Sequence, residues 1–368
     1  MGRAWAVALL LVAGISFSCA SRVPEEQLLL REATTGRTSS AAGLGQRGTI
    51  AAALPVVLWH GMGDSCCSMG SMGSIKQLIE DKLGVFVHSI ATGVGEYQDV
   101  WSSFYGNVNQ QVGKVCGELA SMEELKGGFN MVGFSQGGQF LRAVVQRCGR
   151  RLPPIHSLIT LGGQHQGVAN TPGCSVDLTG AAAKACTAMQ LLLARGAYAP
   201  WVRENIVQAQ YFKVRAAAVI KQLCARHVKY VPGIQRNSRK HMVQAQYFKD
   251  PLQIDSYLRY NIFMPDINNE RDDKNAAYAD NLASLQRLVL FRFDEDTTVV
   301  PRDSAWFSFW DGAETVIPLK DQPLYKEDWL GLRRLDEAGG LIFESAPGEH
   351  MQFTLKWFEE KVVDAYLA

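Results

Sequence analysis

A serine stands at the centre of residues 133–137, which read GFSQG. The apolar residues 129–134 predict a buried strand before it, and residues 136–148 predict an amphipathic helix after it. A G-x-S-x-G sequence in this setting is typical of a sharp turn that presents a serine hydroxyl as a nucleophile. A glycine-rich turn whose serine only caps the helix is the alternative. The flanking strand and helix favour a nucleophile at Ser135.

Acyl transfer at a serine needs a histidine as base, and on this kind of turn the partners follow in the order serine, acid, histidine. His350 fits that order, because it follows a predicted strand at 341–345 and precedes the last predicted helix, at about 351–366. The other six histidines lie too early in the chain or in a suspect insert: His60, His88, His156 and His165 in the first case, His227 and His241 in the second.

The acid is expected in the loop that follows the predicted strand 285–293. Asp294, Asp296 and Asp303 all qualify by position. Asp294 directly ends the strand, where solvation alone explains a carboxylate, so Asp296 is favoured. Each of the three could also be an ordinary solvated loop residue.

The oxyanion that forms on an attacked carbonyl needs N–H donors that are already in place. The residue after the nucleophile, Gln136, supplies one backbone N–H. The loop after the first predicted strand, HGMGD at 60–64, is expected to supply the other from Met62, since Gly61 and Gly63 let that backbone approach. A Met62 that is buried only for packing is the alternative.

The elements that must position these residues alternate between strand and helix. This alternation predicts an α/β fold with a mainly parallel sheet flanked by helices. The stretch from about 170 to 284 is mostly helical in pattern and predicts an inserted cap. The predicted strands are 54–60, 85–90, 129–134, 155–163, 285–293, 315–319 and 341–345, and the helices are 71–82, 98–124, 136–148 and 351–366.

Composition excludes several classes of protein. The 368 residues are 47% hydrophobic, and 37 basic residues against 36 acidic ones leave a net charge of +1. The chain is too apolar for a disordered protein, and its charge balance gives no reason to expect a nucleic-acid partner. Cys66 and Cys67 are adjacent, but no second close Cys or His pair stands at ligand spacing, so a zinc site is not expected. A serine, histidine and acid mechanism needs no metal or other cofactor, so none is expected.

The first residues predict a signal peptide at 1–20, with Arg3 as its positive start, an apolar run at 4–15 and a cleavage site ending at Ala20. Residues 21–53 are polar and glycine-containing, typical of a flexible leader. No later apolar run reaches the roughly 20 residues that span a bilayer, so no transmembrane segment is expected.

Secretion implies an oxidising environment, in which cysteines form disulfides. Seven cysteines follow the predicted signal peptide, so at least one has no partner within the chain. Cys66 and Cys67 are adjacent, and neighbouring Cα atoms about 3.8 Å apart lie below the usual disulfide range. Two free thiols at these positions are the alternative to a strained bridge.

One segment, VQAQYFK, occurs twice, at 207–213 and at 243–249. The 29 residues between the copies, 214–242, contain seven Lys or Arg and no acid. A basic surface arm that makes a weak contact with anionic membranes or acidic partners is one interpretation. A duplicated segment, or an artefact of the sequence, at 214–249 is favoured, since a 36-residue loop inside a compact domain is uncommon.

Several long motifs in order resemble the palmitoyl-protein thioesterases: WHGMGDSCC at 59–67, GFSQGGQFLRAVVQRC at 133–148, GGQHQGV at 162–168 and the loop of His350. The likeness runs from about residue 54 to the C-terminus, interrupted by the insert. It implies an α/β-hydrolase domain at 54–368. It also implies an enzyme that removes palmitate and other long-chain acyl groups from S-acylated cysteines of proteins in lysosomes. S-acylated proteins or peptides and long-chain acyl thioesters would be its partners.

By motif position, the resemblance implies specific roles. The catalytic residues would be Ser135, Asp296 and His350, the oxyanion donors Met62 and Gln136, and the disulfides Cys66–Cys67, Cys116–Cys148 and Cys174–Cys186, with Cys224 unmatched. The family reaches lysosomes through mannose phosphate tags on N-linked sugars, yet this chain has no N-x-S/T sequon, so secretion is also open.

The triad does not distinguish a thioester from an oxygen ester. A lipase or esterase, or an acyl-CoA thioesterase on the same fold, is therefore an alternative function. A catalytically silent acyl-binding homologue, blocked by the duplication in its cap, is an alternative from a different class.

Overall fold

The structure is a computed structural model that describes residues 53–104, 106–169, 249, 254–311 and 315–368. Several expectations lie outside these residues: the signal peptide, the leader up to residue 52, most of the cap, the insert from 214 to 248, Cys174–Cys186 and Cys224. Within the described part of the chain, no helix is both long enough and apolar enough to cross a membrane.

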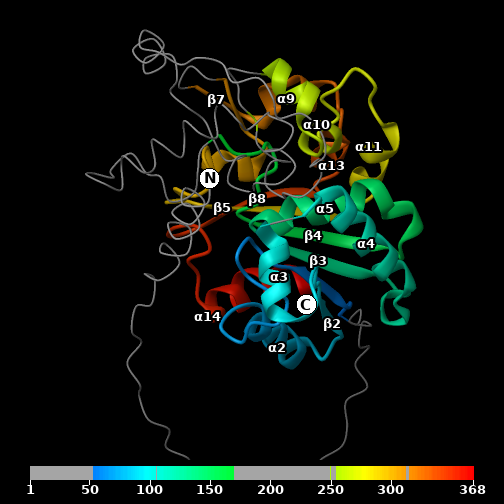
Figure 1. Ribbon diagram of the computed structural model, residues 1–368, viewed down its shortest axis with the longest axis vertical. Helices are drawn as coiled ribbons and strands as arrows, with labels where there is room; N and C mark the ends of the chain where they lie inside the picture. Colours follow the sequence, from blue (N-terminus) through cyan, green and yellow to red (C-terminus); the bar gives the residue numbers. More distant parts are fainter. Residues whose placement is uncertain (1–52, 105, 170–248, 250–253, 312–314) are drawn as a thin grey trace, which may run out of the picture. The chain divides into compact units, whose positions relative to one another are not determined.

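A six-stranded parallel sheet forms the centre of the domain, with strand order β2-β1-β3-β4-β5-β8 (Figure 1). Its central strands are continuous apolar runs because helices cover both faces of the sheet. The bounds are β1 Val56–Trp59, β2 Val87–Ser89, β3 Phe129–Phe134, β4 Ile155–Leu161, β5 Arg287–Phe293 and β8 Leu341–Ala346.

Two hydrophobic cores lie on the two faces of the sheet, because alternate strand residues point to opposite sides. Val57 and Trp59 belong to the core that includes side chains of α4, α5, α11 and α13. Val56 and Leu58 belong to the core beneath α2 and the C-terminal helix. The helices are α2 Met72–Leu83, α3 Gly95–Phe104, α4 Val108–Ser121, α5 Gln136–Cys148, α9 Ile254–Tyr260, α10 Met264–Ile267, α11 Ala276–Ala283, α12 Pro323–Lys326, α13 Leu332–Glu337 and α14 Leu355–Phe358.

The α/β fold, the parallel sheet and the helix 136–148 agree with the sequence prediction. The single helix predicted at 98–124 is wrong, because α3 ends at Phe104 and α4 begins at Val108. Asn107 caps the new start, since its side chain accepts a hydrogen bond from the backbone N–H of Gln110.

Two C-terminal predictions also need correction. The strand predicted at 315–319 is reduced to β7, Val316–Ile317, which pairs antiparallel with β6, Phe309–Trp310, outside the main sheet. Pro318 follows β7 directly and has no N–H with which to extend a ladder. The last helix starts later than predicted, at α14, and continues as a π-helix at Glu359–Leu367.

Candidate active site

Ser135 lies on a strained turn between β3 and α5. Its backbone φ is 51° and its ψ −121°, a conformation that L residues rarely adopt and that marks functional sites. The flanking glycines are required by close backbone contacts. A Cβ on Gly133 would lie 2.7 Å from the carbonyl oxygen of Gly137, and one on Gly137 would lie 2.2 Å from that of Trp59. The turn therefore holds the serine hydroxyl above the end of the sheet.

His350 connects this hydroxyl to a buried carboxylate. Its Nε2 lies 2.8 Å from Ser135 Oγ, and its Nδ1 lies 2.7 Å from Asp296 Oδ2. Asp296 is held in turn by the backbone N–H groups of Thr298 and Val299, which donate to its Oδ1 at 2.9 and 2.8 Å. The acid follows β5 and the histidine follows β8, so the ends of neighbouring parallel strands bring the two together.

The other two aspartates that the sequence left open do not reach the histidine. Arg292 pairs with both of them, at 3.1 Å to Asp294 and 2.5 Å to Asp303. The carboxylates of Asp294 and Asp303 are therefore paired with an arginine of β5. Of the three aspartates, only Asp296 contacts His350.

The two backbone segments expected to supply oxyanion donors both adjoin Ser135. Gln136 directly follows Ser135 and is the first residue of α5. A Cβ on Gly61 would lie 3.2 Å from the Cβ of Ser135, so the loop containing Met62 passes directly beside Ser135. The Met62 side chain also packs against the hydrophobic core.

A second His–Asp pair, which the sequence did not suggest, holds the loop after β1. Asp99 Oδ2 lies 3.3 Å from His60 Nε2 and accepts a hydrogen bond from Cys66 N at 2.8 Å. Its Oδ1 accepts from Thr92 N and Gly93 N. Burial works to raise the pKa of Asp99, but contact with the His60 ring and the backbone N–H donors outweigh it and lower the pKa to about 2.

Gln164 is a further residue at the site that sequence reasoning did not assign. Its Nε2 donates to Ser135 Oγ and to Gly162 O, both at 3.0 Å. Gln139 of α5 locks the amide, because it donates to Gln164 Oε1 at 2.7 Å and accepts from Gln164 N at 3.0 Å. The motif GGQHQGV contains this glutamine, but nothing in its residue type signals the contact with Ser135.

The buried guanidinium of Arg142, on α5, connects this helix to the segments that contain His165 and Asn268. It donates to His165 O at 3.2 Å and to Asn268 Oδ1 at 2.8 Å, and lies over the Phe307 ring. Burial lowers the pKa of Arg142 to about 9, so it remains protonated at neutral pH. Burial, and then the charge of Arg142, lower the pKa of His165 well below its ordinary value, so His165 is neutral.

The structure contains two of the disulfides that the resemblance implied. Cys66–Cys67 joins adjacent residues with Cα atoms 3.8 Å apart, and Cys116–Cys148 joins α4 to the end of α5. The first of these follows the Met62 loop directly. Among the described residues, no group of three or more His, Cys, Asp or Glu is placed to hold a metal ion.

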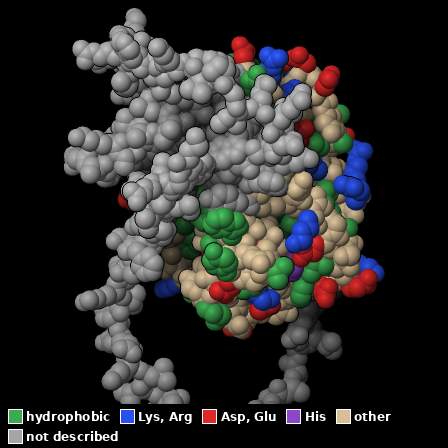
Figure 2. All heavy atoms as spheres, in the orientation of Figure 1, with side chains coloured by type: hydrophobic (Ala, Val, Ile, Leu, Met, Phe, Trp, Pro, Cys, Tyr) green, Lys and Arg blue, Asp and Glu red, His purple; other side chains and the backbone are tan. Residues whose placement is uncertain are grey.

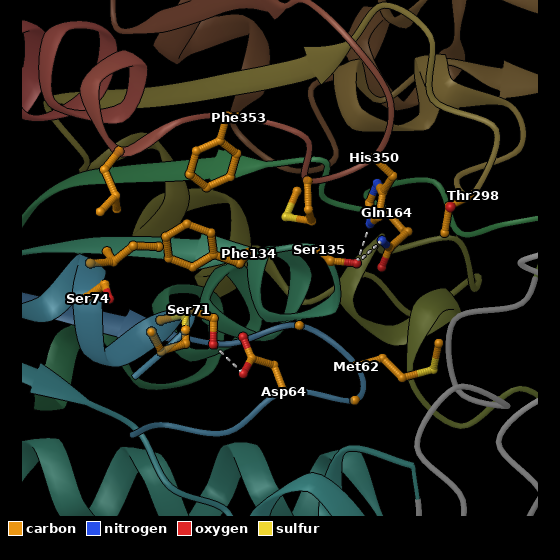
Figure 3. A pocket seen from close by; sticks show the side chains of 17 residues that line it. Met62, Asp64, Ser71, Ser74, Phe134, Ser135, Gln164, Thr298, His350 and Phe353 are labelled. Atoms are coloured by element: carbon orange, nitrogen blue, oxygen red, sulfur yellow. Dashed lines mark hydrogen bonds between the residues drawn. The ribbon is translucent and has the colours of Figure 1, made fainter. Parts of the chain in front are cut away.

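A cavity of about 480 Å³ opens at Ser135 and His350 (Figure 3). Its walls come from the loop after β1, the start of α2, the end of β3 and the segment after His350. The apolar side chains on these walls are Met62, Met72, Ile75, Phe134, Met351, Phe353 and Leu355.

A parallel sheet that carries a strained serine turn after one strand, an acid after a later strand and a histidine after the last defines the α/β-hydrolase class. The comparisons with known proteins then identify the family. The sequence profile described as palmitoyl protein thioesterase matches residues 55–240 and 220–350. The chain belongs to the palmitoyl protein thioesterase family.

Individual relatives agree with this assignment. The chain is 40% identical to palmitoyl-protein thioesterase 1 of Caenorhabditis elegans over 85% of this chain and 91% of the relative. It is 31% identical to palmitoyl-protein thioesterase 3 of Dictyostelium discoideum, over 82% and 86%. A protein named as a lysosomal thioesterase in Mus musculus is 26% identical over 78% of each chain.

Proposed function

We propose that this protein is a serine thioesterase that removes palmitate and other long-chain acyl groups from S-acylated cysteines of proteins. The observation that carries the proposal is the chain of contacts from Ser135 Oγ through His350 to Asp296, at 2.8 and 2.7 Å. These contacts lie at the mouth of a largely apolar cavity, in a chain whose relatives are named palmitoyl-protein thioesterases.

In the first half of the reaction, Ser135 Oγ attacks the thioester carbonyl while His350 Nε2 takes the hydroxyl proton. Asp296 holds the imidazole in the correct tautomer and stabilises the imidazolium. The carbonyl oxygen becomes an oxyanion that the backbone N–H groups of Met62 and Gln136 would receive. The C–S bond then breaks. The departing sulfur takes the proton from the His350 imidazolium, so the cysteine leaves as a thiol and His350 is neutral again. A thiol pKa near 8.5 makes the sulfur a good leaving group.

In the second half, a water molecule attacks the acyl-enzyme with His350 again as base. The Ser135 ester bond breaks, the proton returns to Ser135 Oγ and the fatty acid leaves. Gln164 keeps the serine oxygen in place at the start of each cycle through its 3.0 Å hydrogen bond.

The test compares a palmitoyl thioester with the matched palmitoyl oxygen ester, using purified protein and its Ser135→Ala variant. We expect preferential hydrolysis of the thioester, and a fall in kcat of about 10⁴-fold or more in the variant with an unchanged melting temperature. Preference for the oxygen ester would favour a lipase or esterase. Binding of palmitate without turnover, in a folded protein, would favour a silent homologue.

We further propose that the protein acts in the lysosome, in line with its relative named as a lysosomal thioesterase. Because the chain contains no N-x-S/T sequon, delivery through sugar tags on its own asparagines is not supported, and secretion is the alternative. Imaging a C-terminally tagged chain beside a lysosomal marker separates the two, with a variant lacking residues 1–20 as control.

A further inference from the structure

One wall of the cavity beside Ser135 carries polar groups, with which a fatty acyl chain forms no hydrogen bonds. Asp64, Ser71 and Ser74 line it together with the apolar side chains described above. Figure 3 shows Asp64 and Ser71 across the cavity from Phe353, with Ser135 and His350 at one end. The two hydroxyls are used within the wall, since Ser71 donates to Asp64 and Ser74 donates to Met69 O. A hydrocarbon chain offers no donor to the remaining acceptor sites of the Asp64 carboxylate, so covering that carboxylate with it would cost free energy. The mixed wall instead suits a peptide.

Asp64 is held in place but not neutralised. Its Oδ1 accepts hydrogen bonds from Ser71 Oγ at 2.7 Å and from Ser65 N at 2.8 Å. Among the residues that the structure describes, no Lys, Arg or His forms an ion pair with it. The half-buried carboxylate therefore adds a negative potential to the cavity, which favours a cation there.

The position of the cavity relative to His350 indicates which part of a substrate it receives. His350 delivers its proton to the departing group, so the leaving side of a thioester must face this ring. The cavity wall continues from His350 along the residues that follow it in the chain, Met351, Phe353 and Leu355. The leaving cysteine and its neighbouring residues are thus placed against this wall.

We propose that this cavity is the leaving-group subsite and that Asp64 gives it a preference for a Lys or Arg close to the acylated cysteine. The inference rests on the proposed thioesterase function. It has a simple physical basis in the substrate: a single acyl chain binds membranes only marginally, and a polybasic patch beside it is one of the features that make anchoring stable. The apolar side chains of the wall would contact the aliphatic stems of such residues.

The experiment uses two S-palmitoyl peptides that differ only at one position near the cysteine, lysine in one and its neutral analogue norleucine in the other. The ratio of their kcat/KM values is measured at neutral pH for the full-length protein and for Asp64→Asn. This substitution keeps the shape and an acceptor oxygen for Ser71. We expect the lysine peptide to be favoured about twofold to fivefold, and the ratio to fall to about one in the variant.

Two controls test whether the ratio of the two kcat/KM values reports on the charge of Asp64. Asp81→Asn removes an equal charge from an exposed position of α2, where the carboxylate accepts a hydrogen bond from Gln77, and should keep the preference for lysine. Raising NaCl from about 50 mM to about 500 mM should reduce the preference in the unmodified protein, because salt screens a partly exposed pair. Equal kcat/KM for the two peptides in the unmodified protein would overturn the proposal.

A second measurement tests whether the cavity holds the acyl chain instead. Phe353→Ala is assayed with acyl chains of increasing length on one fixed peptide, and with one fixed acyl chain on the peptide and on a small thiol. A changed peptide-to-thiol ratio with an unchanged chain-length profile supports a leaving-group subsite, whereas a shifted chain-length profile overturns it. Absence of any Ser135-dependent turnover is a different result, because it contradicts the proposed function itself.

Discussion

Two loops of this protein each carry a histidine beside a buried aspartate, yet only one pair faces the cavity. After β1, His60 lies 3.3 Å from Asp99, with side chains 1% and 0% exposed. After β8, His350 lies 2.7 Å from Asp296, with 12% and 2% exposed. The other ring nitrogen decides the difference, because His60 Nδ1 contacts the carbonyl of Gly61 while His350 Nε2 reaches Ser135. A His–Asp pair can transfer a proton to or from a reacting group only where the second ring nitrogen of the histidine contacts that group.

The strongest test of this comparison makes the same substitution in both pairs. Asp296→Asn should lower kcat about 10⁴-fold with little change in melting temperature, because the wrong histidine tautomer is then favoured while the packing is kept. Asp99→Asn should lower kcat by less than about 10²-fold, since it acts only through the Met62 loop. Both are measured with a palmitoyl thioester, at a temperature where both variants are folded. Equal losses of kcat would contradict the division of roles.

Asp99 is expected to contribute more than Asp296 to the free energy of unfolding. Replacing its carboxylate with an amide should cost about 2 kcal/mol of unfolding free energy, since several donors lose a charged acceptor. The pKa of Asp99 in the fold is about 2, below its ordinary 3.8, so its contribution is present above about pH 4 and is lost as the pH falls toward 2.

Melting temperatures measured across this acidic range would show the effect. The difference between the unmodified protein and Asp99→Asn should shrink as the pH falls through it. Asp294→Asn is the matched control, because that carboxylate is partly exposed and pairs with Arg292 of β5. A difference that stays constant with pH would contradict the assigned shift.

Gln164 extends the comparison to a neutral hydrogen-bond partner of Ser135. Gln164→Ala should lower kcat about 10-fold, as one hydrogen bond to Ser135 Oγ is worth on the order of 1 kcal/mol. Since Gln139 only orients this amide, Gln139→Ala should have a smaller effect in the same direction. Steady-state kinetics on one palmitoyl thioester can rank the two variants, and the reverse order would show that the fold, not Ser135, depends on the pair.

The smallest effect is expected from removing the repeat-containing segment at 214–249. Deleting residues 214–249 joins Lys213 to Asp250 and leaves the local sequence VQAQYFKDP unchanged. Lys213 can then take over the buried contacts of Lys249, which donates to Glu270 Oε1 at 2.6 Å and to Gln166 Oε1 at 2.7 Å. We expect kcat/KM and melting temperature to match the full-length protein. A deletion variant that fails to fold would show that the insert belongs to the domain.

Much of the fold follows from local patterns in the sequence. The strand at 129–134 and the helix at 136–148 were predicted to the residue, because a buried parallel strand and an amphipathic helix leave periodic apolar patterns. The break between α3 and α4 was missed, since apolar spacing continues across it and only the cap at Asn107 marks the new start. The strand predicted at 315–319 is shorter and lies outside the main sheet, where it pairs with β6. A local apolar pattern does not indicate which strand is the pairing partner.

The sequence by itself determined the parallel sheet, the turn that carries Ser135 and the position of His350, because periodicity and glycine placement are local properties of the chain. The sequence favoured Asp296 among three aspartates, and the tertiary structure brings that carboxylate to His350. Only the tertiary structure pairs His60 with Asp99 and brings Gln164 to Ser135. The two residues of each contact are far apart in the sequence: 54 positions for Asp296 and His350, 39 for His60 and Asp99, and 29 for Ser135 and Gln164. These contacts depend on how strand ends are brought together across the sheet, and no short-range pattern records that arrangement.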